Sequence, residues 1–400
     1  MKTVKFFFLL LIVILLYACD EDPSSVGDGL TPPKLEIKKI DSITDSLAQT
    51  SVSFLDTVRL SGASRLLLGK HAGLEASFLI KFYPYDPNLE VMPDSIESAL
   101  EADSLIVIDA WIEFSTDYTF GENSNTFDFS AYRITNPWST GFMRDSLSVL
   151  SYAEDVILNK SHTDSTYLVT IDNNLTLRWL KSRIDTTIRD NFGLYFKSST
   201  NSDKILGFES CIGIPAYIID PDLNKNFPTL KMIVEKPGVF QDTIVVKNAL
   251  DAHVVTGNIP ATIPENIYLI GGIPVRSNLQ FDLSNLPKYS GIHKATLEFT
   301  VDTIATKNGS IASNYIYVEA YESISLNKIL SIETFKLSRS GNKFTGDITS
   351  LVQRWVNGLS NQGMRLSLYD EYISAAIIAL KGSNAAENLR PKITIFYSIK

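Results

Sequence analysis

The sequence has little cysteine and few basic residues for its length. Its only two cysteines among 400 residues are Cys19 and Cys211, so one disulfide is possible at most, and none if either is modified. Packing must therefore stabilise the fold. The 36 Lys and Arg residues are outnumbered by 45 Asp and Glu residues, which gives a formal net charge of −9. Because nucleic-acid binding requires a basic surface, this balance excludes nucleic acid as a partner.

Motifs of the common enzyme and metal-site classes are also missing. The sequence contains no phosphate-binding glycine loop, no HExxH helix and no GxSxG turn. None of the four histidines lies at metal-ligand spacing from another histidine or a cysteine, and we expect each in a surface or loop position: His71, His162, His253 and His293. An alternating run resembles the start of an EF-hand loop, but lysine occupies the positions that need glycine and glutamate: Asp220, Asp222, Asn224 and Asn226, with Lys225 and Lys231. A polar turn is the favoured interpretation of this run, and a structural calcium site is the alternative. We therefore predict no catalytic residue, no metal and no cofactor. A pair of glycosidase carboxylates stays open, because only the fold brings such a pair together.

The N-terminus has the organisation of an export signal. Lys2 and Lys5 precede an unbroken apolar run, Phe6–Leu16, which is too short to span a bilayer as a helix. The run ends in Leu16-Tyr17-Ala18-Cys19, which resembles the lipobox of bacterial lipoproteins. That resemblance implies cleavage before Cys19 and acylation of this residue, and several acyl chains give stable membrane anchoring. The alternative is an ordinary secretory signal with an incidental cysteine.

The residues after the predicted lipidation site indicate the membrane to which the protein is sent and the length of the tether between the lipid anchor and the folded domains. An acidic cluster at 20–22 resembles an inner-membrane retention signal of enteric bacteria, or a surface-export signal of Bacteroidetes-like bacteria. The many Asn, Ile, Tyr and Lys residues favour the second, so we expect the outer membrane, with the protein exposed at the cell surface. Residues 23–50 are rich in Ser, Gly and Pro at first and then alternate charged with apolar residues. We expect a flexible tether over 19–52.

An internal repeat organises the rest of the chain. Five blocks recur in the same order, and the pairs are 65–69 with 267–271, 110–114 with 295–299, 178–180 with 354–356, 192–196 with 362–366, and 227–233 with 390–396. The chain therefore divides into a signal peptide (1–18), the tether, and two domains at 53–236 and 240–400. Most blocks alternate apolar and polar residues as half-buried strands do. We expect an all-β fold of two tandem antiparallel jelly-roll-like β-sandwiches, each with one short helix, and with Trp179 and Trp355 in the two cores.

The blocks of the second copy resemble a known family. The relevant segments are Phe281–Pro287, Ile292–Leu297, Asp347–Trp355, Asn361–Met364 and Arg390–Ile393. This succession is similar to the DNRLRE-type domain, a jelly-roll sandwich akin to carbohydrate-binding modules of microbial surface proteins. The first copy departs from it through a long insertion between Phe82 and Ala110. The resemblance implies a fold, a surface context, and glycan or cell-envelope binding as the associated role.

Unmatched aromatic residues supply the candidate binding surfaces. In the predicted strands, Trp111 shares the outward face with Glu113, and three tyrosines of the segment around 315–321 form a second outward stripe. Exposed aromatic rings stack on sugars and are also common in protein interfaces, although strand propensity alone explains many tyrosines. The candidate ligand-binding residues are Trp111, Tyr132, Tyr315, Tyr317 and Tyr321.

Three functions follow from these patterns. The first is a non-catalytic, surface-anchored lipoprotein that binds glycan or envelope polymer. The second is a structural or assembly lipoprotein of the outer membrane that binds other proteins. The third is a polysaccharide-degrading enzyme, which is disfavoured because no catalytic set is visible and the two domains look alike.

Overall fold

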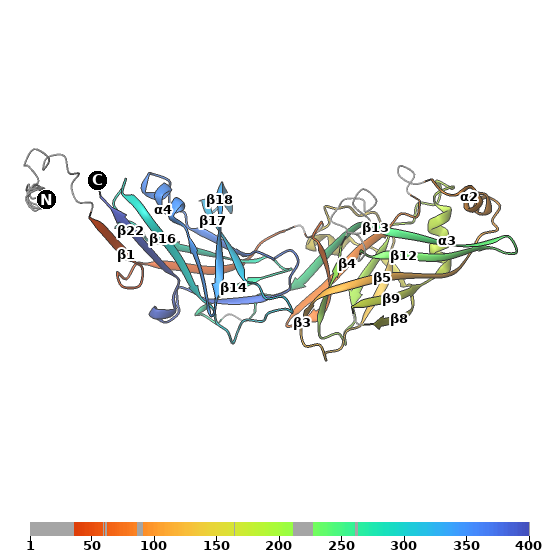
Figure 1. Cartoon of the computed structure of the whole chain (residues 1–400), viewed down its shortest axis with the longest axis horizontal. Helices are drawn as coiled ribbons and strands as arrows, with labels where there is room; N and C mark the ends of the chain where they lie inside the picture. Colours follow the sequence, from red (N-terminus) through yellow and green to blue (C-terminus); the bar gives the residue numbers. More distant parts are fainter. Residues whose placement is uncertain are drawn as a thin grey trace, which may run out of the picture.

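The structure is a computed structural model of the chain and describes residues 36–58, 60, 62–85, 91–163, 165–210, 227–260 and 263–399. The predicted lipidation site at Cys19, the acidic cluster, Cys211 and the EF-hand-like run at 220–226 lie outside these residues. The described residues form two β-sandwiches arranged end to end (Figure 1). The fold is nearly all β and antiparallel, so the predicted fold class is confirmed.

The first sandwich contains eleven strands and two α-helices among the described residues. The strands are β3 (Arg65–His71), β4 (Leu74–Phe82), β5 (Ile106–Phe120), β6 (Phe129–Ile134), β7 (Tyr152–Asp155), β8 (Ile157–Thr163), β9 (Thr166–Ile171), β10 (Leu194–Ser198), β11 (Ile205–Glu209), β12 (Thr229–Lys236) and β13 (Phe240–Gly257). The helices are α2 (Asp94–Glu101) and α3 (Asn173–Lys181), and a 3₁₀ helix, η1, spans Arg144–Val149.

The second sandwich also contains eleven described strands. They are β1 (Ile37–Asp41), β2 (Gln49–Leu55), β14 (Asn266–Ile270), β15 (Val275–Phe281), β16 (Gly291–Thr300), β17 (Tyr315–Ser323), β18 (Lys328–Ser340), β19 (Lys343–Asp347), β20 (Met364–Leu368), β21 (Ile377–Lys381) and β22 (Lys392–Ser398). One α-helix, α4 (Thr349–Val356), and a short 3₁₀ helix, η3 (Glu387–Leu389), complete it.

Alternating side chains build each core in the way the sequence predicts. In β5, Ala110, Ile112 and Phe114 are buried, whereas Trp111 and Glu113 are half-exposed on the other face. The same period of two recurs in β16, where Ala295, Leu297 and Phe299 are buried. Period-two burial is the signature of a sheet with one face against the core.

The repeat predicted from the sequence is present at the level of strand register. Thr229 of β12 lies opposite Glu113 of β5, and the equivalent Lys392 of β22 lies opposite Glu298 of β16. The loop before β10 is equally well matched to the loop before β20. The side-chain amide of Asn191 donates to the carbonyl of Phe82 at 2.9 Å, and that of Asn361 donates to the carbonyl of Phe281 at 2.9 Å.

Each of these loops ends in a glycine with the same left-handed backbone, and this gives a matched pair of mutations. Gly193 has a φ of +86° and Gly363 has a φ of +87°; an added Cβ would lie 2.2 Å from the carbonyl oxygen of Ile80 in the first case and 3.0 Å from that of Leu279 in the second. A left-handed Ala costs about 1–2 kcal/mol on its own. We expect Gly193→Ala to lower the stability of the chain more than Gly363→Ala, because its Cβ also meets backbone that cannot move aside.

Urea unfolding of the two variants measures this difference. Gly341→Ala is the control, because Gly341 also has positive φ (+60°) but nothing lies within 4 Å of the added Cβ. If all three variants lost the same stability, close backbone approach at Gly193 would be refuted as the cause.

The predicted tether and domain boundaries are wrong in an informative way. Residues 37–55 were expected within or beside a flexible tether, but β1 pairs with β22 and β2 pairs with β15, so both strands belong to the second sandwich. The expected start of the second domain at 240 is also wrong, because β13 pairs with β12 and β4 of the first sandwich. Short strands without fully buried side chains, such as β2, have no strong apolar pattern by which a sequence could reveal them.

The expectation of one helix per domain holds for the described part of the second sandwich and fails for the first. The additional helix, α2, lies in the insertion that follows Phe82. Its residues Ile96, Ala99 and Leu100 are buried in the core of the first sandwich.

The two sandwiches meet through an apolar cluster and direct hydrogen bonds. The cluster combines residues of the first sandwich and its leading linker with residues of the second: Leu60, Leu67, Leu74, Ala76, Tyr118, Phe120, Ile205 and Val255 with Tyr268, Ile270, Ile273, Val275, Ala375, Ile377 and Ala379. The backbone N–H of Ala375 donates to the Tyr118 hydroxyl at 3.0 Å, and the Arg65 guanidinium donates to the carbonyl of Ile373 at 2.6 Å. This junction fixes the two sandwiches to each other.

Candidate functional site

A cleft of about 480 Å³ lies beside the C-terminal end of α4 in the second sandwich. Three chain segments form its walls: 48–50 at the start of β2, 280–288 between β15 and β16, and 355–361 after α4. The residues that line it are Ala48, Gln49, Thr50, Gln280, Phe281, Asp282, Leu283, Ser284, Leu286, Lys288, Trp355, Val356, Leu359 and Asn361. Its volume falls within the range of about 300–1,000 Å³ that is usual for small-molecule sites.

The apolar wall of the cleft is built around Trp355. Leu351, Val352 and Val356 form the buried face of α4, and Trp355 lies at the edge of that face. The indole packs against the core of the second sandwich on one side but stays half-exposed in the cleft. A rigid ring that is held from behind and open in front is a platform on which another flat, partly apolar surface can stack.

Polar groups surround this platform. The side-chain oxygen of Gln49 is buried and has no hydrogen-bond partner among the described residues. Asp282 accepts a hydrogen bond from the backbone of Ser284, and this bond, with one from the Ser284 hydroxyl, holds the pKa of Asp282 below its usual value. Asp282 is therefore an ionised acceptor at neutral pH. Lys288 is exposed at the rim and forms no ion pair within the part of the chain that the structure describes.

The first sandwich contains the same tryptophan but no such opening. Trp179 of α3 is equivalent to Trp355, yet it is only 1% exposed. The copies also differ in the insertion after Phe82, whose Met92, Ile96 and Leu100 belong to the same apolar core as Trp179. Lys181 of α3 also forms an ion pair with Asp103, just after α2. In the second sandwich the corresponding connection is only the loop from Asp282 to Ser290.

The predicted core positions of the two tryptophans are therefore half right. The prediction is confirmed for Trp179 and wrong for Trp355. Sequence reasoning placed both residues on the apolar face of a helix, which is correct. It did not connect the length of the preceding loop with exposure of the ring, although the insertion in the first copy was visible.

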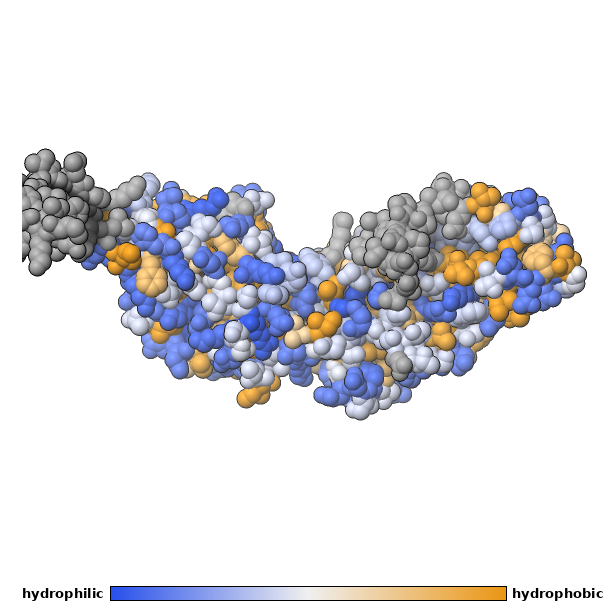
Figure 2. Space-filling model, in the orientation of Figure 1, coloured by the Kyte–Doolittle hydropathy of each residue, from blue (hydrophilic) through white to orange (hydrophobic). Residues whose placement is uncertain are grey.

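The predicted outward position of Trp111 is confirmed. Its ring lies half-exposed on the outer face of β5, and its Nε1 donates to Glu113 at 3.0 Å. Glu113 also accepts from Lys231 at 2.7 Å. Figure 2 shows hydrophobic residues gathered towards the end of the first sandwich that lies away from the second one. On strands β5 and β13, Ile106, Ile108 and Val245 are more than 40% exposed. Trp111 belongs to an open sheet surface.

Tyr315 and Tyr317 also point outward, as predicted, but their neighbours differ from the expectation. Tyr369, from the turn after β20, lies 5.6 Å from the Tyr315 ring and 5.1 Å from the Tyr317 ring. The ammonium group of Lys336 lies 3.6 Å from the centre of the Tyr315 ring. These four residues form a cationic aromatic patch. Tyr369 was missed because it comes from a turn that the repeat alignment does not cover.

Tyr132 and Tyr321 do not extend this patch. Tyr132 lies on β6 in the first sandwich and is half-buried against Tyr152, with 5.0 Å between their rings. The prediction that Tyr321 faces solvent is wrong, since this residue is only 2% exposed. The register of β17 against β18 shifts on both sides of Tyr321, and Asn327 in the turn that follows comes within 3.3 Å of its hydroxyl. Burial raises the pKa of Tyr321 to about 12.

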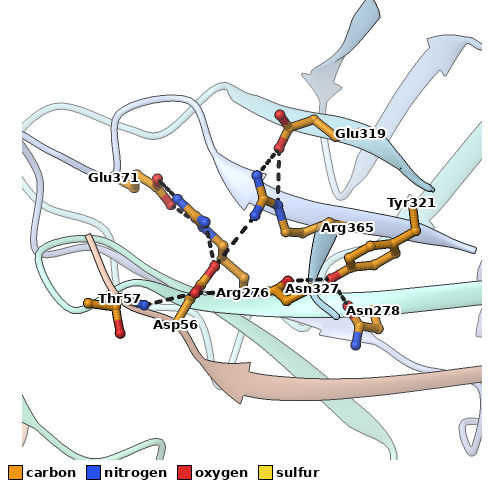
Figure 3. A network of polar contacts seen from close by, with 9 residues as sticks. All are labelled: Asp56, Thr57, Arg276, Asn278, Glu319, Tyr321, Asn327, Arg365 and Glu371. Carbon is orange, nitrogen blue, oxygen red and sulfur yellow. Dashed lines mark hydrogen bonds and ion pairs between the residues drawn. The ribbon is translucent and has the colours of Figure 1, made fainter. Parts of the chain in front are cut away.

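Tyr321 instead belongs to a buried polar network on the outer face of β15, β17 and β20 (Figure 3). Its hydroxyl donates to Asn278 at 2.6 Å. Beside it, the guanidinium of Arg276 is bracketed by Asp56 and Glu371, each at 2.5 Å. Asp56 is the first residue after β2, so this network fixes the point where the chain leaves the second sandwich for the first.

One histidine contradicts the expected surface position. His253 of β13 is completely buried, and neither of its ring nitrogens has a hydrogen-bond partner among the described residues. Removal from water, together with the positive charge of Arg65, lowers the pKa of His253 to about 3. The ring is therefore neutral at physiological pH.

No protein-family model and no curated protein matches the chain. Within the described residues, no group of three or more His, Cys, Asp or Glu side chains is arranged to hold a metal ion, and no helix has the length and apolarity needed to cross a bilayer.

Proposed function

We propose that this protein is a non-catalytic recognition lipoprotein that binds a glycan or envelope polymer in the cleft beside Trp355. The proposal includes the lipid anchor at Cys19 and exposure at the outer membrane, both of which come from the sequence. The observation that carries the binding function is the contrast between the two copies. The equivalent tryptophan is buried in one sandwich and open to a 480 Å³ cleft in the other.

The chemistry of the cleft suits a sugar. A pyranose ring has an apolar C–H face that stacks on an aromatic ring, and hydroxyl groups around its edge that need donors and acceptors. Trp355 supplies the ring, while Gln49 and Asp282 supply acceptors and Lys288 supplies a donor. A buried acceptor without a partner, such as the Gln49 oxygen, costs free energy, and a ligand relieves this cost if the side chain turns its oxygen towards the cleft.

Titration calorimetry tests this function. The chain lacking the first 19 residues is titrated with a panel of envelope polysaccharides. We expect Trp355→Ala to weaken binding of the best ligand at least tenfold, because a central aromatic contact contributes about 1.4 kcal/mol or more. Trp111→Ala is the matched control and should bind as the wild type does. Thermal unfolding checks that both variants fold.

Two results would contradict the proposal. One is a polysaccharide that binds the Trp355→Ala variant as tightly as the wild type. The other is a wild-type protein that binds none of the polymers tested.

The alternative assembly function has one observation in its favour. The cationic aromatic patch of Tyr315, Tyr317, Tyr369 and Lys336 has the composition of a protein interface, in which aromatic residues are enriched. Tyr369→Ala would then release a co-purifying envelope protein while leaving polysaccharide binding unchanged.

A further inference from the structure

The two sequence repeats exchange their leading strands inside the molecule. Each repeat begins with a strand segment that precedes its sandwich: β1 and β2 come before β3, and β13 comes before β14. Yet β1 and β2 pair with the sandwich of the second repeat, and β13 pairs with the sandwich of the first. We call residues 36–56, which contain β1 and β2, the N-terminal arm.

Strand registers show that the arm and β13 occupy equivalent places. Asp251 of β13 lies opposite Ile80 of β4, and Ser51 of the arm lies opposite Leu279, which is the repeat equivalent of Ile80. At the other edge, Ile244 of β13 lies opposite Met232, and Ile40 of the arm lies opposite Ile395, the equivalent of Met232. Both contacts fall at equivalent positions of the two sandwiches, although the arm is longer between them than β13.

This arrangement means that each sandwich is completed by a strand segment that its own repeat does not provide. The arm crosses the junction through the linker after Asp56, and β13 crosses it in the opposite sense through the linker after Gly257. The seam formed by β15 and β22 therefore accepts an arm that is connected to it only through another folded unit. Such a seam has no requirement that the arm come from the same molecule.

The arm is held more weakly than β13. No residue of β2 is fully buried, and Val52 and Leu55 are 57% and 43% exposed. In β1, Ile40 is the sole residue that joins the apolar core. By contrast, Ile244, Val246, Ala252, Val254 and Val255 of β13 are all buried in apolar clusters. Segments with few buried apolar contacts are the first to open.

We propose that the partner of the β15–β22 seam is the N-terminal arm of a second copy of this chain, so that two copies pair by exchanging arms. Every contact of the exchanged arm would be the contact seen here, including those of Asp56 with Arg276 and of Ser53 with Ser277. If the first sandwich moves together with its arm, the arm contacts and the junction contacts of Leu60 all re-form between copies, so the extent of exchange rises with concentration. Because Gln49 and Thr50 belong to the arm, each copy would also supply part of the cleft of the other.

Disulfide cross-linking of the chain lacking its first 19 residues, with Cys211→Ser, tests the exchange independently of any ligand. Lys39 of β1 lies directly opposite Phe396 of β22, and both side chains are exposed. One copy carries Lys39→Cys and a second, differently tagged copy carries Phe396→Cys. The mixture is warmed to just below its unfolding midpoint, cooled and oxidised. We expect a covalent heterodimer on non-reducing gels, several-fold more abundant than in the control.

The control pairs Lys39→Cys with Ile304→Cys, because Ile304 is 95% exposed and lies outside every strand of the described residues, so it reports random collision. A double variant with both Lys39→Cys and Phe396→Cys in one chain shows that the two positions can form a disulfide. If the double variant cross-links as a monomer while the mixed single variants give no more heterodimer than the control, arm exchange between copies is ruled out.

Discussion

Replacing Arg276 by methionine is expected to destabilise the protein by about 3–5 kcal/mol, the largest single effect that we predict. Arg276 is buried between Asp56 and Glu371, at 2.5 Å from each, and Glu371 is itself buried. Removal of Arg276 leaves the buried Glu371 without its guanidinium partner and leaves Asp56 with Arg365 at 3.5 Å as its remaining ion-pair partner, and an uncompensated buried charge is costly. The loss should appear as a lower urea midpoint with an unchanged m-value.

Two further variants separate the charge from the packing. Arg276→Met combined with Glu371→Leu should recover part of the loss, because the second change removes one stranded carboxylate. Lys328→Met breaks the exposed ion pair with Glu322 and should cost less than about 1 kcal/mol. Equal losses for Arg276→Met and Lys328→Met would contradict a buried, charge-coupled network.

The second large effect is acid destabilisation through His253. Its pKa is about 3 in the folded chain, against a usual value of 6.5. Above pH 6.5 the ring is neutral in both folded and unfolded chains, and it contributes no pH dependence. As the pH falls from about 6.5 towards 3, only the unfolded chain gains this proton, so stability is lost by up to about 1.4 kcal/mol per pH unit. Over the whole window the loss is of order 4 kcal/mol.

Unfolding midpoints measured between pH 7 and pH 4 check this effect. His253→Leu should flatten the pH profile over that range, and at pH 7 it should leave stability unchanged or higher, since two buried nitrogens without partners are removed. His162→Gln is the control because His162 is exposed. An identical pH slope in the wild type and His253→Leu would mean that other groups cause the acid lability.

Much of the fold follows from the sequence because burial in a β-sandwich leaves a regular trace. The alternation in β5 and β16, the repeated Asn-x-Gly loop before β10 and β20, and the outward position of Trp111 could all be predicted. The N-terminal arm could not. Few of its side chains are fully buried, and its backbone pairs with strands more than 200 residues away, which leaves no local pattern.

Less of the candidate site than of the fold could be predicted from the sequence. The predicted strand face gives the correct exposure for Tyr315 and the wrong exposure for Tyr321. The register of β17 against β18 shifts on both sides of Tyr321, and a sequence pattern does not reveal such a shift. The cleft depends on three segments that meet only in the fold. The relevant signal was a difference between the copies, namely that the loop after Phe281 lacks the insertion that follows Phe82.

The distance along the chain between the arm and its seam also bears on the order in which the protein folds. Ser51 binds Ser383, a residue 332 positions later. The first sandwich has all of its strands once Gly257 has been made, but the second waits for β22, almost the last segment to be synthesised. The arm is therefore the first described segment to be made and among the last to be docked. Pairing over such a separation is slow, and an undocked strand edge is prone to aggregation, so a newly made chain should be most vulnerable in the interval between completion of its two halves.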